Sequence, residues 1–136
     1  MILTAIEQKK ETLEHRDYVQ EMQVETAKDG YQFTFVIADI AGYEGENSIN
    51  QTLYHVQAEN LEMAAALYQR ENERQLDFGH MKQIAADMTG QEIHPLLLEL
   101  GHRSGISKSI PVMMETDGAK YILREMIKAA YGRESL

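Results

Sequence analysis

Eight residues in the second half of the sequence combine side chains that suit the binding of an anion. The segment His102–Ser109 has the sequence HRSGISKS, and no acidic residue occurs between Glu99 and Glu115. Glycine, hydroxyl and cationic groups together can surround a phosphate or carboxylate with N–H and O–H donors. In a phosphate-binding P-loop the second glycine directly precedes the lysine, which is not the case here. The candidate ligand-binding residues are His102, Arg103, Ser104, Lys108 and Ser109, and an ordinary solvated loop is the alternative.

Two residues of the first half, Asp39 and His55, are candidates for acid–base chemistry. Asp39 continues the alternation of an apolar strand and is followed by the polar segment 41–48, whereas His55 lies within a second strand-like segment. Other catalytic patterns are missing from the sequence: it has no cysteine, no Gly-x-Ser-x-Gly and no His-Glu-x-x-His. We therefore favour a protein that is not an enzyme, with enzymatic activity left open.

Five histidines raise the question of a metal site. Glu99 and His102 have the i, i+3 spacing that occurs in di-iron carboxylate bundles. Those bundles need two such motifs and further glutamates on four long helices, which this sequence does not supply. Oxygen ligands around Asp39 match no calcium-binding motif. We predict no metal and no cofactor.

Charge is distributed unevenly along the 136 residues. Residues 1–78 contain 15 acidic and 6 basic residues, whereas residues 79–136 contain 7 of each, so the formal net charge of −9 belongs to the first part. An acidic protein does not bind phosphate backbones in general, because such binding needs clustered cations. The length indicates a single domain over 1–136. Neither a signal peptide nor a membrane span is evident, which predicts a cytoplasmic location.

The first half has a clear pattern of secondary structure. Apolar residues alternate with polar ones in 17–24 and 31–37, and the Lys28-Asp29-Gly30 turn between them predicts an antiparallel hairpin. A third strand is expected at 51–58. Asn60 is a suitable N-cap for a helix that reaches residue 75. Before the hairpin, an amphipathic helix is expected up to residue 15, resting on the sheet or pairing with a second copy.

The second half is more ambiguous. The spacing of apolar residues from 78 to 88 predicts a helix over 77–90, with a strand over 82–86 as the alternative. Pro95 suits the first position of a short helix that ends at Gly101. Residues 110–114 are expected to form an edge strand because of Pro111. A final helix is expected over 119–131.

These elements predict an α+β domain. Its antiparallel sheet would have three strands, or four, flanked by the N-terminal helix and two to four further helices. The acidic half, the N-terminal helix and the edge segment 110–114 favour a regulatory protein that binds another protein and forms a homodimer. The alternative is a small enzyme or ligand-binding domain that holds an anion at the 101–109 loop.

Overall fold

The computed structural model describes residues 16–39 and 50–134. These residues form seven strands and three helices: β1 (Arg16–Ala27), β2 (Gly30–Asp39), β3 (Asn50–Ala58), α2 (Leu61–Asn72), β4 (Gln75–Asp77), β5 (Gln83–Asp87), α3 (Gly90–His102), β6 (Pro111–Met114), β7 (Ala119–Ile122) and α4 (Leu123–Glu134). The helix expected up to residue 15 lies outside the described residues, so that prediction is not tested.

All seven strands belong to one mixed sheet with the order β3-β2-β1-β5-β6-β7, and β4 pairs with β1 beside β5. The pairs β1–β4, β1–β5 and β5–β6 are parallel, whereas β1–β2, β2–β3 and β6–β7 are antiparallel. The prediction of a purely antiparallel sheet of three or four strands is therefore wrong. The observed fold is a mixed sheet of seven strands with three helices.

The hairpin predicted from alternation is confirmed. Ala27 pairs with Gly30, so the loop between β1 and β2 consists of Lys28 and Asp29. Asp29 has a φ of 62°, a left-handed conformation that aspartate tolerates in turns. Gly30 has no room for a side chain, because a Cβ there would lie 2.5 Å from the carbonyl oxygen of Ala58 on β3. The glycine therefore lets three strands approach closely at this end of the sheet.

The second half joins the sheet along the other side of β1. β4 pairs with the start of β1 at Arg16–Tyr18, and β5 pairs with its later part at Glu21–Glu25. Between them, the backbone N–H of Lys82 donates to the carbonyl of Gln20 at 2.7 Å. The long strand β1 thus joins both halves of the described chain in one sheet.

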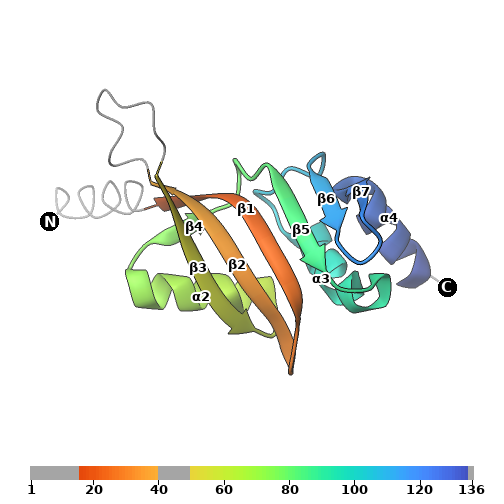
Figure 1. The fold of residues 1–136 in the computed structure, drawn as a ribbon, viewed down its shortest axis with the longest axis horizontal. Coiled ribbons are helices and arrows are strands. Elements are labelled where there is room, and N and C mark those ends of the chain that lie inside the picture. The colour runs from red at the N-terminus through yellow and green to blue at the C-terminus, as the bar shows by residue number, and fades with distance from the viewer. Residues whose placement is uncertain (1–15, 40–49, 135–136) are drawn as a thin grey trace, which may run out of the picture.

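The three described helices cover one face of the sheet and leave the other face uncovered (Figure 1). Aromatic side chains of β2 fill the covered side: Phe33 and Phe35 have no exposed surface, and their rings stack with centroids 5.9 Å apart. Across β3, Tyr54 continues this row and makes an edge-to-face contact with Tyr68 of α2 at 4.7 Å. The core therefore lies between the sheet and the helices.

Two predictions for the second half are wrong, and both errors concern strands. Residues 83–87 form β5, so the alternative strand is correct and the helix over 77–90 is not. Ile84, Ala86 and Met88 are buried at a spacing of two, which is the period of a strand. The final helix begins at Leu123, because residues 119–122 form β7 against β6.

The proline predictions also need correction. β6 lies between β5 and β7 and is not an edge strand; Pro111 is tolerated because it is the first residue of β6. α3 begins at Gly90 rather than at Pro95, because Thr89 and Glu92 form a capping box. Gly101 lies within α3 and not at its cap. A Cβ on Gly101 would approach the ring of Tyr131 to 2.5 Å, so the absence of a side chain at this position lets α4 pack closely against α3.

No helix in the described segments is both long enough and apolar enough to cross a membrane.

Candidate interaction surface

The loop between α3 and β6 contains the residues predicted to bind an anion. The ammonium of Lys108 donates to the carbonyls of Arg103 at 2.7 Å and Ile106 at 3.0 Å. Partial burial, together with the charge of Arg103, lowers the pKa of Lys108. The hydroxyls of Ser107 and Ser109 lie 2.9 Å apart. The loop thus uses its lysine to hold its own backbone together.

Arg103 and His102 also pack against the protein. The guanidinium carbon of Arg103 lies 5.1 Å from the ring centroid of Phe78, and the ring of His102 lies 5.5 Å from that of Tyr131. Both residues line an open groove with Ser104 and the acidic side chains Glu62 and Glu99. Two carboxylates disfavour an anion in this groove. Binding of an anion by these residues stays a prediction.

Glu99 has a role that its spacing from His102 did not reveal. Its carboxylate oxygens accept hydrogen bonds from the backbone N–H groups of Leu61 and Glu62, each at 2.8 Å. These N–H groups belong to the first turn of α2, where helical partners are missing and a negative charge is favourable. Glu99 therefore attaches α3 to the start of α2. Among the described residues, no group of three metal-binding side chains comes together.

The two candidate acid–base residues are far apart. Asp39 pairs with Asn50 at one end of the β2–β3 ladder, and His55 pairs with Thr34 five residues further along. At 3.4 Å per residue, this corresponds to about 17 Å. His55 lies on the uncovered side of β3, where its Nδ1 is 2.9 Å from the hydroxyl of Thr34. The structure does not bring this pair together with the loop that follows α3.

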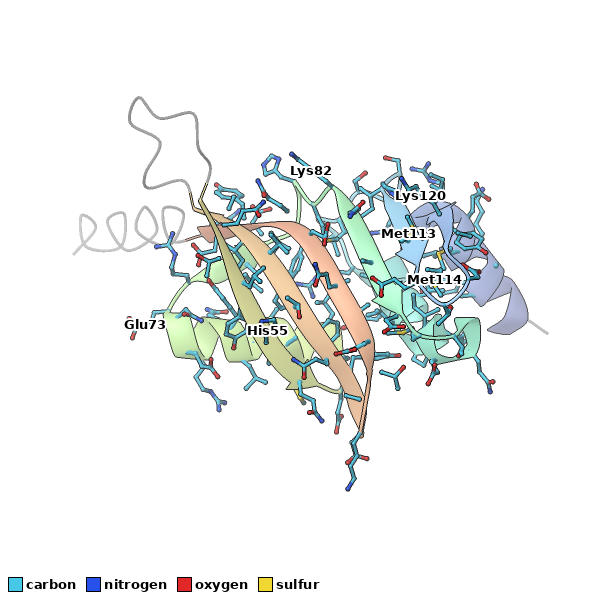
Figure 2. The ribbon with its side chains drawn as sticks, in the orientation of Figure 1. His55, Glu73, Lys82, Met113, Met114 and Lys120 are labelled. Atoms are coloured by element: carbon cyan, nitrogen blue, oxygen red, sulfur yellow. The ribbon has the colours of Figure 1, made fainter. Side chains whose placement is uncertain are left out.

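The uncovered side of the sheet is the largest feature that these predictions missed. We call it the open face; it consists of side chains that alternate with the buried ones on β1, β2, β3 and β5. They are mostly amide, hydroxyl and carboxylate side chains: Glu21, Gln23, Glu25, Gln32, Thr34, Gln51, Leu53, His55, Gln57, Gln83, Ala85 and Asp87, whereas Val36 on the same side of β2 is itself buried. Figure 2 shows His55 on β3 and Lys82 at the start of β5. A sheet face with this composition is stable in water without a covering layer.

Hydrogen bonds between side chains give the open face a defined arrangement. Glu21 accepts from the amide of Gln23 at 2.7 Å and from that of Gln83 at 2.6 Å, which links β1 to β5. Gln51 on β3 donates to Gln20 on β1 at 2.8 Å, across β2. Side chains held in this way lose less conformational freedom when a partner binds.

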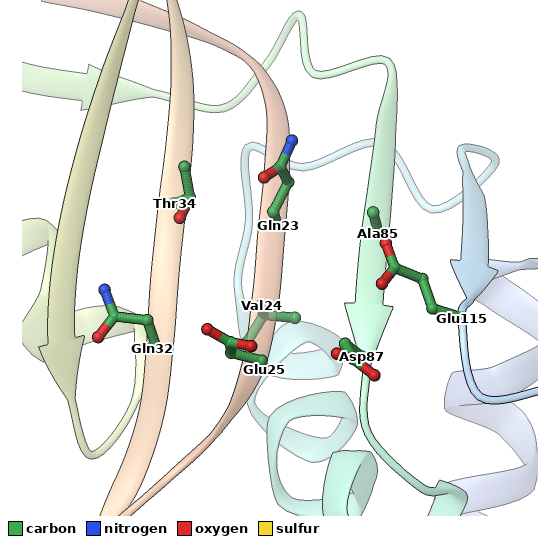
Figure 3. A pocket seen from close by; sticks show the side chains of 8 residues that line it. All are labelled: Gln23, Val24, Glu25, Gln32, Thr34, Ala85, Asp87 and Glu115. Carbon is green, nitrogen blue, oxygen red and sulfur yellow. The ribbon is translucent and has the colours of Figure 1, made fainter.

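Two shallow hollows lie in the open face. The smaller, of about 130 Å³, is lined by residues that include Glu25, Asp87 and Glu115, and none of its lining residues in the described segments is basic (Figure 3). The larger, of about 480 Å³, lies toward Leu53 and Lys82. Gln23 lines both hollows and lies between them. The smaller hollow is suited to donor groups or cations of a partner.

The signal for the open face was present in the sequence. Gln32, Thr34, His55 and Gln57 occupy the polar positions of the same alternation that identified the core. The alternation shows which side chains point away from the core, but not that four strands place them on one surface. It also gave no indication that β5 lies beside β1, because that pairing joins segments about 60 residues apart.

Fold and surface together define a class of domain: a mixed sheet with helices on one face and a preorganised polar face on the other. The sequence of residues 9–128 matches the family described as spore germination protein N-terminal domain. This match covers most of the chain, which therefore belongs to that family. No curated protein and no solved structure matches the chain significantly.

Proposed function

We propose that this domain is a non-enzymatic binding module of spore germination, which binds another macromolecule through the open face of its sheet. Membership of the spore germination family supports a role in germination. The hydrogen-bonded side chains on β1, β3 and β5 support the choice of the open face as the binding surface. Its partner is expected to present amide or cationic donors at the hollow that contains Glu25 and Asp87.

The observation that carries this proposal is the contrast between the covered and the open face. Apart from the tyrosines Tyr31 and Tyr68, the protein buries no polar or charged side chain among the described residues, so its other polar groups are concentrated at the surface. Binding sites that need a preorganised polar surface use such groups, whereas catalytic centres generally use buried titratable groups with shifted pKa values. The cytoplasmic location and the absence of nucleic-acid binding stay predictions.

The proposed role of the open face is tested by a substitution that changes the charge at its centre. Gln23 lines both hollows and is exposed, so Gln23→Arg places a cation there without changing the core. Gln69→Arg makes the same change on the exposed side of α2 and is the matched control. The full-length protein that carries each variant is produced in spores, and germination is followed by the loss of optical density.

We expect Gln23→Arg to slow germination and Gln69→Arg to leave it unchanged, with both proteins folded and equally abundant. Normal germination with Gln23→Arg would contradict the assignment of function to this face. Equal slowing by both variants would show that the effect is not specific to it.

A further inference from the structure

The outer edge of β3 is available for pairing. Among the described strands, β3 is the last on its side of the sheet and pairs only with β2, from Asn50↔Asp39 to Ala58↔Tyr31. Within the described ranges, no backbone group of β3 has a hydrogen-bond partner on the outer side. An edge strand of this kind presents unpaired N–H and C=O groups along about 30 Å.

β3 also lacks the features by which proteins usually block an edge. Its nine residues, NQTLYHVQA, include no charged residue, no proline and no glycine. Its register with β2 is regular over all nine pairs. At the opposite end of the sheet, β7 has only four residues and includes Lys120. The two edges therefore differ in their capacity to accept another strand.

We propose that β3 pairs with β3 of a second copy of this chain, in antiparallel orientation about a two-fold axis beside Tyr54. Two sheets would then form one continuous sheet across the dimer. Full overlap of the nine residues places Leu53 opposite His55 of the second copy and Gln51 opposite Gln57. Carboxamides both donate and accept hydrogen bonds, and no like charges meet, so the segment is complementary to itself.

Helix α2, which lies beside this edge, favours a second copy of the chain over an extended peptide as the partner of β3. The hydroxyl of Tyr54 on β3 donates to Glu71 of α2 at 2.8 Å. This contact shows which side of α2 lies along β3. Leu67 and Met63 lie four and eight residues before Glu71, on the same side of the helix. Met63 is 43% exposed, and Leu53, on the other side of the sheet, is 57% exposed.

A two-fold axis perpendicular to the joined sheet would place both copies of α2 on one side of it. Leu67, next to Tyr68 in the turn of α2 that contacts Tyr54, would then lie near its counterpart, while Leu53 would pack near the axis on the open face. A peptide added as a single strand would bring no second Leu67 to this side of the sheet. The positions of these apolar side chains on both sides of one edge therefore favour a dimer.

The dimer is tested by sedimentation equilibrium of the purified full chain over a range of concentrations. We expect twice the mass of 15.5 kDa at high concentration. Leu53→Lys places two ammonium groups near the axis and is expected to raise the dissociation constant roughly tenfold or more. Ile122→Lys, at the exposed edge strand β7, is the matched control and is expected to have no effect.

The register is tested with a spin label, for which the absence of native cysteines is convenient. With Gln57→Cys, the proposed antiparallel pairing separates the two labelled backbones by about 20 Å. A monomer at the highest soluble concentration would overturn the proposal. A dimer that Leu53→Lys leaves intact would overturn it as well, because the contact would then lie elsewhere.

Discussion

The two faces of β2 show how this domain separates stability from recognition. Phe33 and Phe35 point toward the helices and are completely buried, whereas Gln32 and Thr34, their neighbours in the sequence, lie on the open face. The first pair contributes to folding through the removal of apolar surface from water. The second pair is half-buried and can be reached by a partner from the open face. Substitutions one residue apart should therefore have different consequences.

The largest effect is expected at Phe35. Its ring stacks on Phe33 and makes an edge contact with Phe78 at 5.7 Å. Phe35→Ala would lose these contacts and leave a cavity, so we expect the free energy of unfolding to fall by about 3–5 kcal/mol. Urea denaturation measures this change. Thr34→Ala, as the control on the open face, should change it by no more than about 0.5 kcal/mol; similar losses for both would remove the distinction between the faces.

A smaller loss is expected where a polar group supports the covered side. Asp17 on β1 accepts hydrogen bonds from the hydroxyl of Tyr68 and, at 2.6 Å, from Nε of Arg74. Asp17→Ala leaves both donors without this acceptor, which should cost about 1–3 kcal/mol of the free energy of unfolding. Asp87→Ala removes an exposed carboxylate of the open face and should change it little. Thermal unfolding of both variants decides between these expectations.

Alkaline pH should lower the free energy of unfolding mainly through tyrosines on the covered side of the sheet. Burial, followed by the hydrogen bond to Asp17 and the charge of Asp17, raises the pKa of Tyr68. Burial and Glu71 raise the pKa of Tyr54 to about 12. In the unfolded chain both phenols titrate near pH 10. Their contribution to stability is therefore complete below pH 10 and declines as the pH rises toward the folded values.

Tyr68→Phe isolates this effect. The variant cannot ionise at residue 68, so its urea midpoint should fall less steeply between pH 9 and 11 than that of the unchanged protein. An equal fall in both proteins would show that Tyr68 does not contribute to the alkaline loss.

The smallest effect is a gain at the end of α2, the helix that covers β3. Glu73 has a φ of 56°, a left-handed conformation that costs a side-chain residue about 1 kcal/mol. Glu73→Gly removes this cost but increases the entropy of the unfolded chain, so a net gain of about 0.5 kcal/mol is expected. Gln69→Gly, within the last turn of the same helix, should instead lose up to about 1 kcal/mol. Chemical denaturation of the two variants should show opposite signs.

The parts of the fold that the sequence predicted well depend on contacts between neighbours in the chain. The β1–β2 hairpin has its turn at Lys28 and Asp29, and α2 begins after Asn60, whose side chain accepts from the N–H of Met63 at 2.8 Å. Strand alternation and helix capping are local, so their signals lie within a few residues. The errors in the second half have the opposite cause. β5 is a strand because β1 and β6 lie beside it, and neither is near it in the sequence.

The candidate site shows the same division. Residue types and spacing drew attention to Lys108 and to the pair Glu99 and His102. In the folded chain, Lys108 binds carbonyls of its own loop, and Glu99 caps a helix that begins 38 residues earlier. Side-chain chemistry can be inferred from the sequence, but the group that each side chain meets depends on the packing of distant segments.

By itself, the sequence determined the alternation of buried and exposed side chains on β1, β2 and β3 and the uncharged character of β3. These properties follow from residue type and the two-residue period of a strand. Only the tertiary structure decided that β5 extends the sheet, that all described helices cover one face, and that β3 lies at its edge. These features depend on contacts between segments far apart in the chain, for which no local pattern of residues provides a signal.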